Sequence, residues 1–230
     1  MPRPLAFLAL GALVAGAGLL LGGCHHAPRS TAHLFPEAFT PMGHRGARGL
    51  APEHPAAAFD IALKLGIPFE LDTMALKGGE LVVTHDDTLD RVTSGAGTGP
   101  VADATLEHVQ ALEFGAHFDP SFKGEPIPLL KDVLARYGDK VLINIEVKSL
   151  KGSPNDVLAK AVVREVEEAG LAERVIITSF NPFLLELVRL ENPDIARGQI
   201  YGTFEDADLK SYEKDLWRNR AFNRKAQPDC

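Results

Sequence analysis

Short apolar runs alternate with longer amphipathic stretches from residue 41 to near the end of the chain. Runs 67–76 and 141–147 have the length and apolar content of buried strands, whereas 53–65 and 156–169 carry apolar residues at helical spacing. This alternation is typical of parallel strands that are joined by covering helices. It therefore predicts an α/β fold with a parallel sheet.

The composition is that of an ordinary globular protein with a negative charge. The 230 residues are 45% hydrophobic and 24% charged, which is enough apolar content for a sizeable core. The formal net charge of −7 argues against a general nucleic-acid binder, because such proteins need a basic face. We therefore expect no nucleic-acid partner.

The N-terminus has the three regions of an export signal. Arg3 supplies a positive charge, residues 5–21 are apolar and rich in Ala, Gly and Leu, and small residues precede Cys24. This pattern resembles a bacterial lipoprotein signal peptide at 1–23, after which Cys24 is lipidated. A plain transmembrane anchor is the alternative, because the apolar run is nearly long enough to span a bilayer. Either way we expect an exported, membrane-anchored domain on the periplasmic or cell-surface side, with a linker at 24–40.

Residues with acid–base and ligand chemistry lie at the ends of the short apolar runs. His44 and His85 each follow such a run, and an imidazole is the side chain best suited to proton transfer near neutral pH. Glu70 and Asp72 are two positions apart in strand 67–76, so both point to one face and can share a cation. A (β/α) barrel carries its site at these strand ends.

A second buried strand, 141–147, adds charged residues to this set. By the two-residue period of a strand, Glu146 and Lys148 point to one face, and buried charges of this kind usually mark a site. Arg45 offers a planar fork for a phosphate, while Arg48 is open between a phosphate contact and a solvated side chain. Two acid–base groups, a hard-metal site and an anion clamp together suggest metal-assisted phosphoryl chemistry.

A hairpin is predicted to carry the second histidine back to the acids. A turn around Gly78–Gly79 separates strand 67–76 from a short strand at 81–84. With the turn centred on the two glycines, His85 is expected to lie opposite Asp72.

Three further histidines lack comparable neighbours. We interpret His54, His108 and His117 as surface or core residues, although His54 lies close to the predicted site. For Asp86 two interpretations remain open: it binds the cation, or it caps the turn that follows His85.

The same patterns predict the domain organisation. Residues 41–230 are expected to form one barrel domain, and the irregular region at about 87–128 is an insertion that shapes a substrate rim. About five barrel strands are visible, whereas a closed eight-stranded barrel typically needs about 250 residues. We therefore expect a (β/α)8 barrel whose last strands are missing from this chain, rather than a different fold.

Six short motifs over about residues 41–201 resemble those of the glycerophosphodiester phosphodiesterase family. Any one of them alone is a weak signal, but six in order at family-like spacing are specific. The motifs are His44-Arg45-Gly46, Pro52-Glu53, Glu70-x-Asp72, His85-Asp86, Ile127-Pro128-Leu129 and Asn144-Ile145-Glu146-Val147-Lys148.

The resemblance implies a fold, an activity and a role for each matching residue. The family has a (β/α)8 barrel and uses a divalent metal, calcium or magnesium. It hydrolyses small glycerophosphodiester substrates to glycerol 3-phosphate and an alcohol. By resemblance His44 and His85 are the general acid–base pair, Glu70, Asp72 and Glu146 hold the metal, Arg45 and Lys148 contact the phosphate, and Glu53 lies near the ligand.

Two departures from the family pattern leave other functions open. The family usually reads Pro-Glu-Asn-Thr where this chain has Pro52-Glu53-His54-Pro55, and the family's last barrel strands are absent from the sequence. One alternative is an inactive lipoprotein that binds glycerophosphodiesters or a partner surface. The other is a phospholipase-type phosphodiesterase that uses the same histidines on intact lipids.

Overall fold

The computed structural model describes residues 28–150, 154–202 and 210–230. The predicted signal peptide at 1–23, the predicted lipidation site Cys24 and the first residues of the linker lie outside these ranges. Within the described ranges, no helix is both long enough and apolar enough to cross a membrane.

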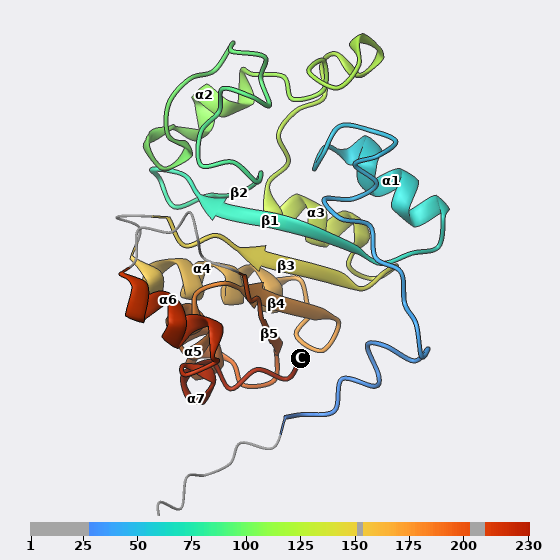
Figure 1. Cartoon of the computed structure of the whole chain (residues 1–230). Coiled ribbons are helices and arrows are strands. Elements are labelled where there is room, and N and C mark those ends of the chain that lie inside the picture. The colour runs from blue at the N-terminus through green and yellow to red at the C-terminus, as the bar shows by residue number, and fades with distance from the viewer. Residues whose placement is uncertain (1–27, 151–153, 203–209) are drawn as a thin grey trace, which may run out of the picture.

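Five strands form one sheet in the described part of the chain, in the order β2-β1-β3-β4-β5 (Figure 1). Strands β1, β3, β4 and β5 are parallel neighbours, whereas β2 pairs antiparallel with β1. Because the parallel strands follow one another in sequence order, the sheet is wound in one direction, as in a (β/α) barrel. The strands are β1 Phe69–Ala75, β2 Leu81–Val83, β3 Ile143–Val147, β4 Val175–Ser179 and β5 Ala196–Gln199.

Four helices cover one face of this sheet and form the main core with it. Every second strand residue points to them: Leu71, Ile145 and Ile177 are adjacent across three strands and fully buried in this core. These helices are α1 Ala56–Lys64, α3 Leu130–Tyr137, α4 Asn155–Glu168 and α5 Pro182–Glu191, and the shorter helices α6 Ser211–Arg218 and α7 Asn223–Ala226 follow β5.

The opposite face of the sheet carries the polar residues. Asp72, Glu146 and Thr178 lie in one row across β1, β3 and β4, and Glu70 lies two residues before Asp72 on the same face. Helices on one side and a row of polar side chains on the other correspond to the outside and the inside of a barrel. The predicted α/β fold is therefore confirmed as part of a barrel, with five strands rather than eight in the described residues.

Residues 87–128, which we interpret as an insertion, lie above β1 and β2 in Figure 1 and have an apolar cluster of their own. Leu89, Val101 and Val109 pack there together with Met74, which lies two residues beyond Asp72 in β1. The insertion therefore rests on the same strand that carries two of the acids. Its short helices are η1 Val101–Asp103, α2 Leu106–Gln110 and η2 Pro120–Phe122.

The first predicted helix begins later than expected. It was placed at Glu53, but α1 starts at Ala56. Pro55 disfavours a right-handed helical conformation in the residue before it, and His54 has a left-handed φ of +74°, which a right-handed helix cannot contain. The segment 44–55 is therefore a loop that crosses the inner face of the sheet.

The hairpin register is shifted by one residue from the prediction. The connection between the strands, residues 76–80, is centred on Gly78, with Gly79 at φ +92°, and Thr73 consequently pairs with Val83. Strand β2 ends at Val83, so His85 reaches the site from the loop that follows and does not lie opposite Asp72 in the ladder.

Candidate active site

The loop 44–55 follows β1 closely and so brings the first histidine over the sheet. The Gly46 N–H donates to the Glu70 carbonyl at 3.1 Å, and the Arg45 N–H donates to the Glu70 carboxylate at 2.8 Å. Gly46 has φ +74°, and a Cβ there would lie 2.9 Å from the backbone of Ala58. Only glycine fits this position without strain, and the turn it allows sets His44 beside Glu70.

Three carboxylates converge on the inner face of β1 and β3. Glu70, Asp72 and Glu146 each offer an oxygen within 4.8 Å of the others, and all three residues are buried. Burial, together with the charge of Asp72, raises the pKa of Glu70 to about 8, and burial also raises the pKa of Glu146. The buried Oε1 of Glu70 accepts no hydrogen bond from the described residues. Acids arranged in this way fit a hard divalent cation with oxygen ligands.

Two cationic side chains lie against these acids. The Lys148 ammonium is 2.8 Å from Oδ1 of Asp72 and also contacts Glu146. Arg45 Nε lies 3.5 Å from Oδ2 of Asp72, and Arg45 Nη1 donates to Glu53 at 3.1 Å. The residues predicted to contact a phosphate are therefore brought to the predicted metal site.

His44 occupies the open side of the site. Its Nε2 lies 3.8 Å from Oε2 of Glu70, and 52% of its side chain is exposed. Partial burial, followed by the charges of Arg45 and Arg48, lowers the pKa of His44 below its ordinary value. The imidazole is therefore neutral near pH 7 and can accept a proton.

A chain of charged side chains holds His85. Its Nδ1 lies 2.8 Å from Oδ1 of Asp86, and Arg91 donates to both oxygens of Asp86, with Nε at 2.6 Å. Arg91 also donates to Glu53 at 2.5 Å, and Glu53 in turn pairs with Arg45. Hydrogen bonds from Arg91 lower the pKa of Asp86 to about 2, so this carboxylate stays ionised. The two histidine-bearing loops are thus joined.

Sequence reasoning missed two members of the site, His54 and Arg91. The sequence predicts a surface or core residue at His54, close to the site; the side chain is buried at 2% exposure, but its Nε2 also lies 3.1 Å from Oδ2 of Asp72. A usable signal was its place directly after Glu53, inside a family motif. Arg91 had no such signal, because its contact with Glu53 joins residues 38 positions apart. For Asp86, the described contacts are with His85 and Arg91.

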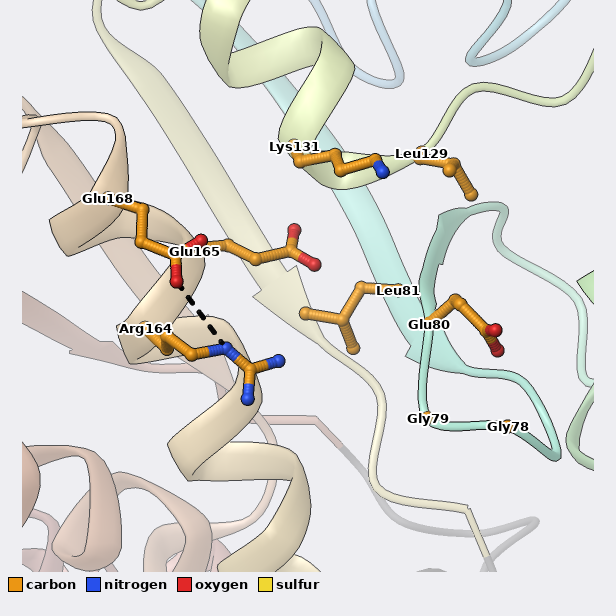
Figure 2. Close-up of a pocket in the computed structure, with 9 residues that line it drawn as sticks. All are labelled: Gly78, Gly79, Glu80, Leu81, Leu129, Lys131, Arg164, Glu165 and Glu168. Carbon is orange, nitrogen blue, oxygen red and sulfur yellow. Dashed lines mark ion pairs between the residues drawn. The ribbon is translucent and has the colours of Figure 1, made fainter.

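A pocket of about 290 Å³ lies away from this site, on the helical side of the sheet (Figure 2). It opens between the β1–β2 turn, the start of α3 and the side chains of α4, and none of the predicted site residues lines it. Its half-buried acid, Glu165, faces the start of α3, where the backbone N–H of Lys131 stabilises the carboxylate. Burial raises the pKa of Glu165 to about 7. Glu165 therefore interacts with the N-terminus of α3 and is not part of the candidate active site on the inner face of the sheet.

Four parallel strands wound in one direction, with acids, histidines and cations on their inner face, are the arrangement of a (β/α)-barrel enzyme. Residues 44–227 match the model of the glycerophosphoryl diester phosphodiesterase family, and the chain belongs to this family.

Known proteins similar to this chain carry the same family name. A glycerophosphodiester phosphodiesterase of Caldanaerobacter subterraneus is 40% identical over 163 residues, which cover 70% of this chain and 65% of the relative. One from Bacillus subtilis is 32% identical over 182 residues, covering 73% and 61%. The matched part of the chain thus spans less than two thirds of the length of each of these relatives.

Solved structures show the same likeness. The crystal structure of a glycerophosphodiester phosphodiesterase from Agrobacterium tumefaciens has a TM-score of 0.62 and 34% identity, covering 69% of this chain and 66% of the other. A phosphodiesterase from Oleispira antarctica, solved in complex with the product sn-glycerol-3-phosphate, has a TM-score of 0.65 and 28% identity, covering 77% and 70%.

Proposed function

We propose that this protein hydrolyses glycerophosphodiesters to glycerol 3-phosphate and an alcohol, with a divalent metal and a pair of histidines. The observation that carries this proposal is the convergence of Glu70, Asp72 and Glu146 between His44 and His85. Family membership supports the reaction class. The product found in the similar Oleispira antarctica structure supports the glycerol phosphate half of the substrate.

The three acids are the residues that would hold the metal, and their oxygen ligands favour calcium or magnesium. When bound, such an ion withdraws charge from a non-bridging phosphate oxygen and helps to ionise the attacking hydroxyl. Arg45 and Lys148 place two positive charges beside these acids, where they can stabilise the negative charge that develops on the transferring group.

The two histidines are assigned opposite proton transfers. His44, whose pKa is lowered, accepts the proton of the attacking hydroxyl as its oxygen forms the new bond to phosphorus. His85, whose Nδ1 lies against the ionised Asp86, gives a proton to the leaving alkoxide as the old P–O bond breaks. Each transfer is expected to contribute about 10²–10⁴-fold to the rate.

Removal of the metal tests this function directly. After dialysis against a chelator, release of glycerol 3-phosphate from glycerophosphocholine should fall to background, because the phosphate charge is no longer neutralised. Added calcium or magnesium should restore it, and dialysis without chelator is the control. Undiminished activity would remove the metal from the scheme.

The same assay separates the two alternative functions. Tight binding of glycerophosphocholine without turnover in excess metal would identify an inactive binding protein. Turnover of intact phosphatidylcholine but not of the deacylated diester would identify a phospholipase-type enzyme.

Arg91 should affect the reaction through His85. We expect Arg91→Gln to lower kcat by about 10²-fold with little change in KM, because Asp86 loses its charged donor and the imidazole loses its fixed orientation. Steady-state kinetics on glycerophosphocholine measure this effect. Arg164→Gln, an exposed arginine on α4, is the matched control, and an unchanged kcat for Arg91→Gln would contradict the role.

The export signal and the lipid anchor at Cys24 remain proposals from the sequence. Their support is the arrangement of a positive charge, an apolar run and small residues before a cysteine. An anchored enzyme on the periplasmic or cell-surface side would meet diesters released from lipids outside the cytoplasm.

A further inference from the structure

His54 stands where the family pattern usually has asparagine, and the structure gives it a specific contact. The side chain is 3% exposed, and its Nε2 accepts a hydrogen bond from the Asp72 N–H at 3.2 Å. The same nitrogen lies 3.1 Å from Oδ2 of Asp72. Two hydrogen bonds are open to this nitrogen: a bare Nε2 accepts from the Asp72 N–H, whereas an Nε2 that carries the proton donates to Oδ2 and so holds the carboxylate itself.

The backbone of His54 is built to hold this contact. Its N–H donates to the Arg45 carbonyl at 3.1 Å, and its φ of +74° is a conformation in which histidine and asparagine are enriched among residues with side chains. Pro55 follows as the N-cap residue of α1, so the backbone of His54 is fixed next to the start of a helix.

The contact with His54 bears on the orientation of the Asp72 carboxylate. Its Oδ2 faces His54 and Arg45, at 3.1 and 3.5 Å. Its Oδ1 faces Lys148, which also contacts Glu146, so this oxygen is turned toward the other acids. A partial rotation of the carboxylate about its Cβ–Cγ bond would break these contacts and turn the inner oxygen away from Glu146.

We propose that His54 is a positioning residue that sets the rotation of the Asp72 carboxylate and thereby the affinity of the acid cluster for its divalent cation. The inference rests on the proposed function only in taking the three acids as metal ligands. Partners that orient a ligand from outside the metal shell typically contribute about 10–100-fold to metal affinity.

The test measures binding of the metal, not only turnover. Calorimetric titration of the full chain with Ca²⁺ should give a Kd about 10–100-fold weaker for His54→Gly, which removes the ring but tolerates the left-handed backbone. His54→Asn, which restores a polar group able to donate and accept, should recover most of the affinity. His108→Gly is the matched control on an exposed histidine.

Further measurements distinguish the possible failures. Thermal unfolding without metal shows whether each variant is folded, and His54→Asn keeps the test valid if His54→Gly is not. A lowered activity of His54→Gly should return as the Ca²⁺ concentration is raised, which a general loss of structure would not allow. Equal Kd values for the wild type and His54→Gly would overturn the positioning role. If the wild type itself bound neither Ca²⁺ nor Mg²⁺, the metal-dependent function would fall, and this inference with it.

Discussion

Replacement of His85 by glutamine should lower kcat for glycerophosphocholine hydrolysis by about 10²–10⁴-fold, the usual contribution of a positioned acid or base. Glutamine keeps a polar side chain of similar reach but cannot deliver a proton to the leaving alkoxide. The loss should be smaller for a diester with a good leaving group, such as the p-nitrophenyl ester, because that alcohol departs without protonation. Initial rates on the two substrates give the comparison.

The control for this variant is His108→Gln, which makes the same change at an exposed histidine in the insertion. Its rate should equal that of the wild type. Equal losses on both substrates for His85→Gln would show that His85 is not the group that protonates the leaving alcohol, and full activity would exclude it from the chemistry.

Loss of one acid from the cluster should have a comparable effect through the metal. Glu146→Gln should lower kcat/KM by roughly 10³-fold at a fixed metal concentration, since the metal supplies several kcal/mol of transition-state stabilisation and about 1.4 kcal/mol corresponds to tenfold. The variant should also lose the rise in melting temperature that a bound cation gives the wild type. Thermal unfolding with and without Ca²⁺ measures this second effect.

Glu107→Gln, at an exposed acid on α2, is the matched control for Glu146→Gln. It should keep both the activity and the stabilisation by metal. If Glu146→Gln were stabilised by Ca²⁺ as strongly as the wild type, the cation would have to bind elsewhere. Loss of activity with an intact metal response would instead assign Glu146 a role in the reaction other than ligation.

The parts of the fold that could be predicted are those set by local periodicity. The predicted strands at 67–76 and 141–147 correspond to β1 and β3, because continuous apolar runs with β-branched residues have few other solutions. The convergence of the acids was predictable for the same reason. Glu70 and Asp72 share a face by the period of a strand, and parallel pairing then sets Glu146 beside Asp72.

The parts that could not be predicted depend on contacts between distant residues. The sequence predicts a helix from Glu53, but the chain stays in a loop up to residue 55, and the course of this loop is fixed by left-handed residues and by hydrogen bonds to β1. His54 could not be assigned to the site without this course. The hairpin register depended on whether the loop has an even or an odd number of residues, which two adjacent glycines do not decide.

The packing of Met74 connects the insertion to the strand that carries Glu70 and Asp72. Met74 and Asp72 point to the same face of β1. Met74 is buried in the apolar cluster of the insertion, and Asp72 is the most buried of the three acids. Since packed interiors transmit strain, a change of volume deep in the insertion will shift β1 and, with it, the spacing of the carboxylates. Residues that never contact a substrate can thereby alter the geometry of the acid cluster, so substitutions in that region have a route to altered cation binding.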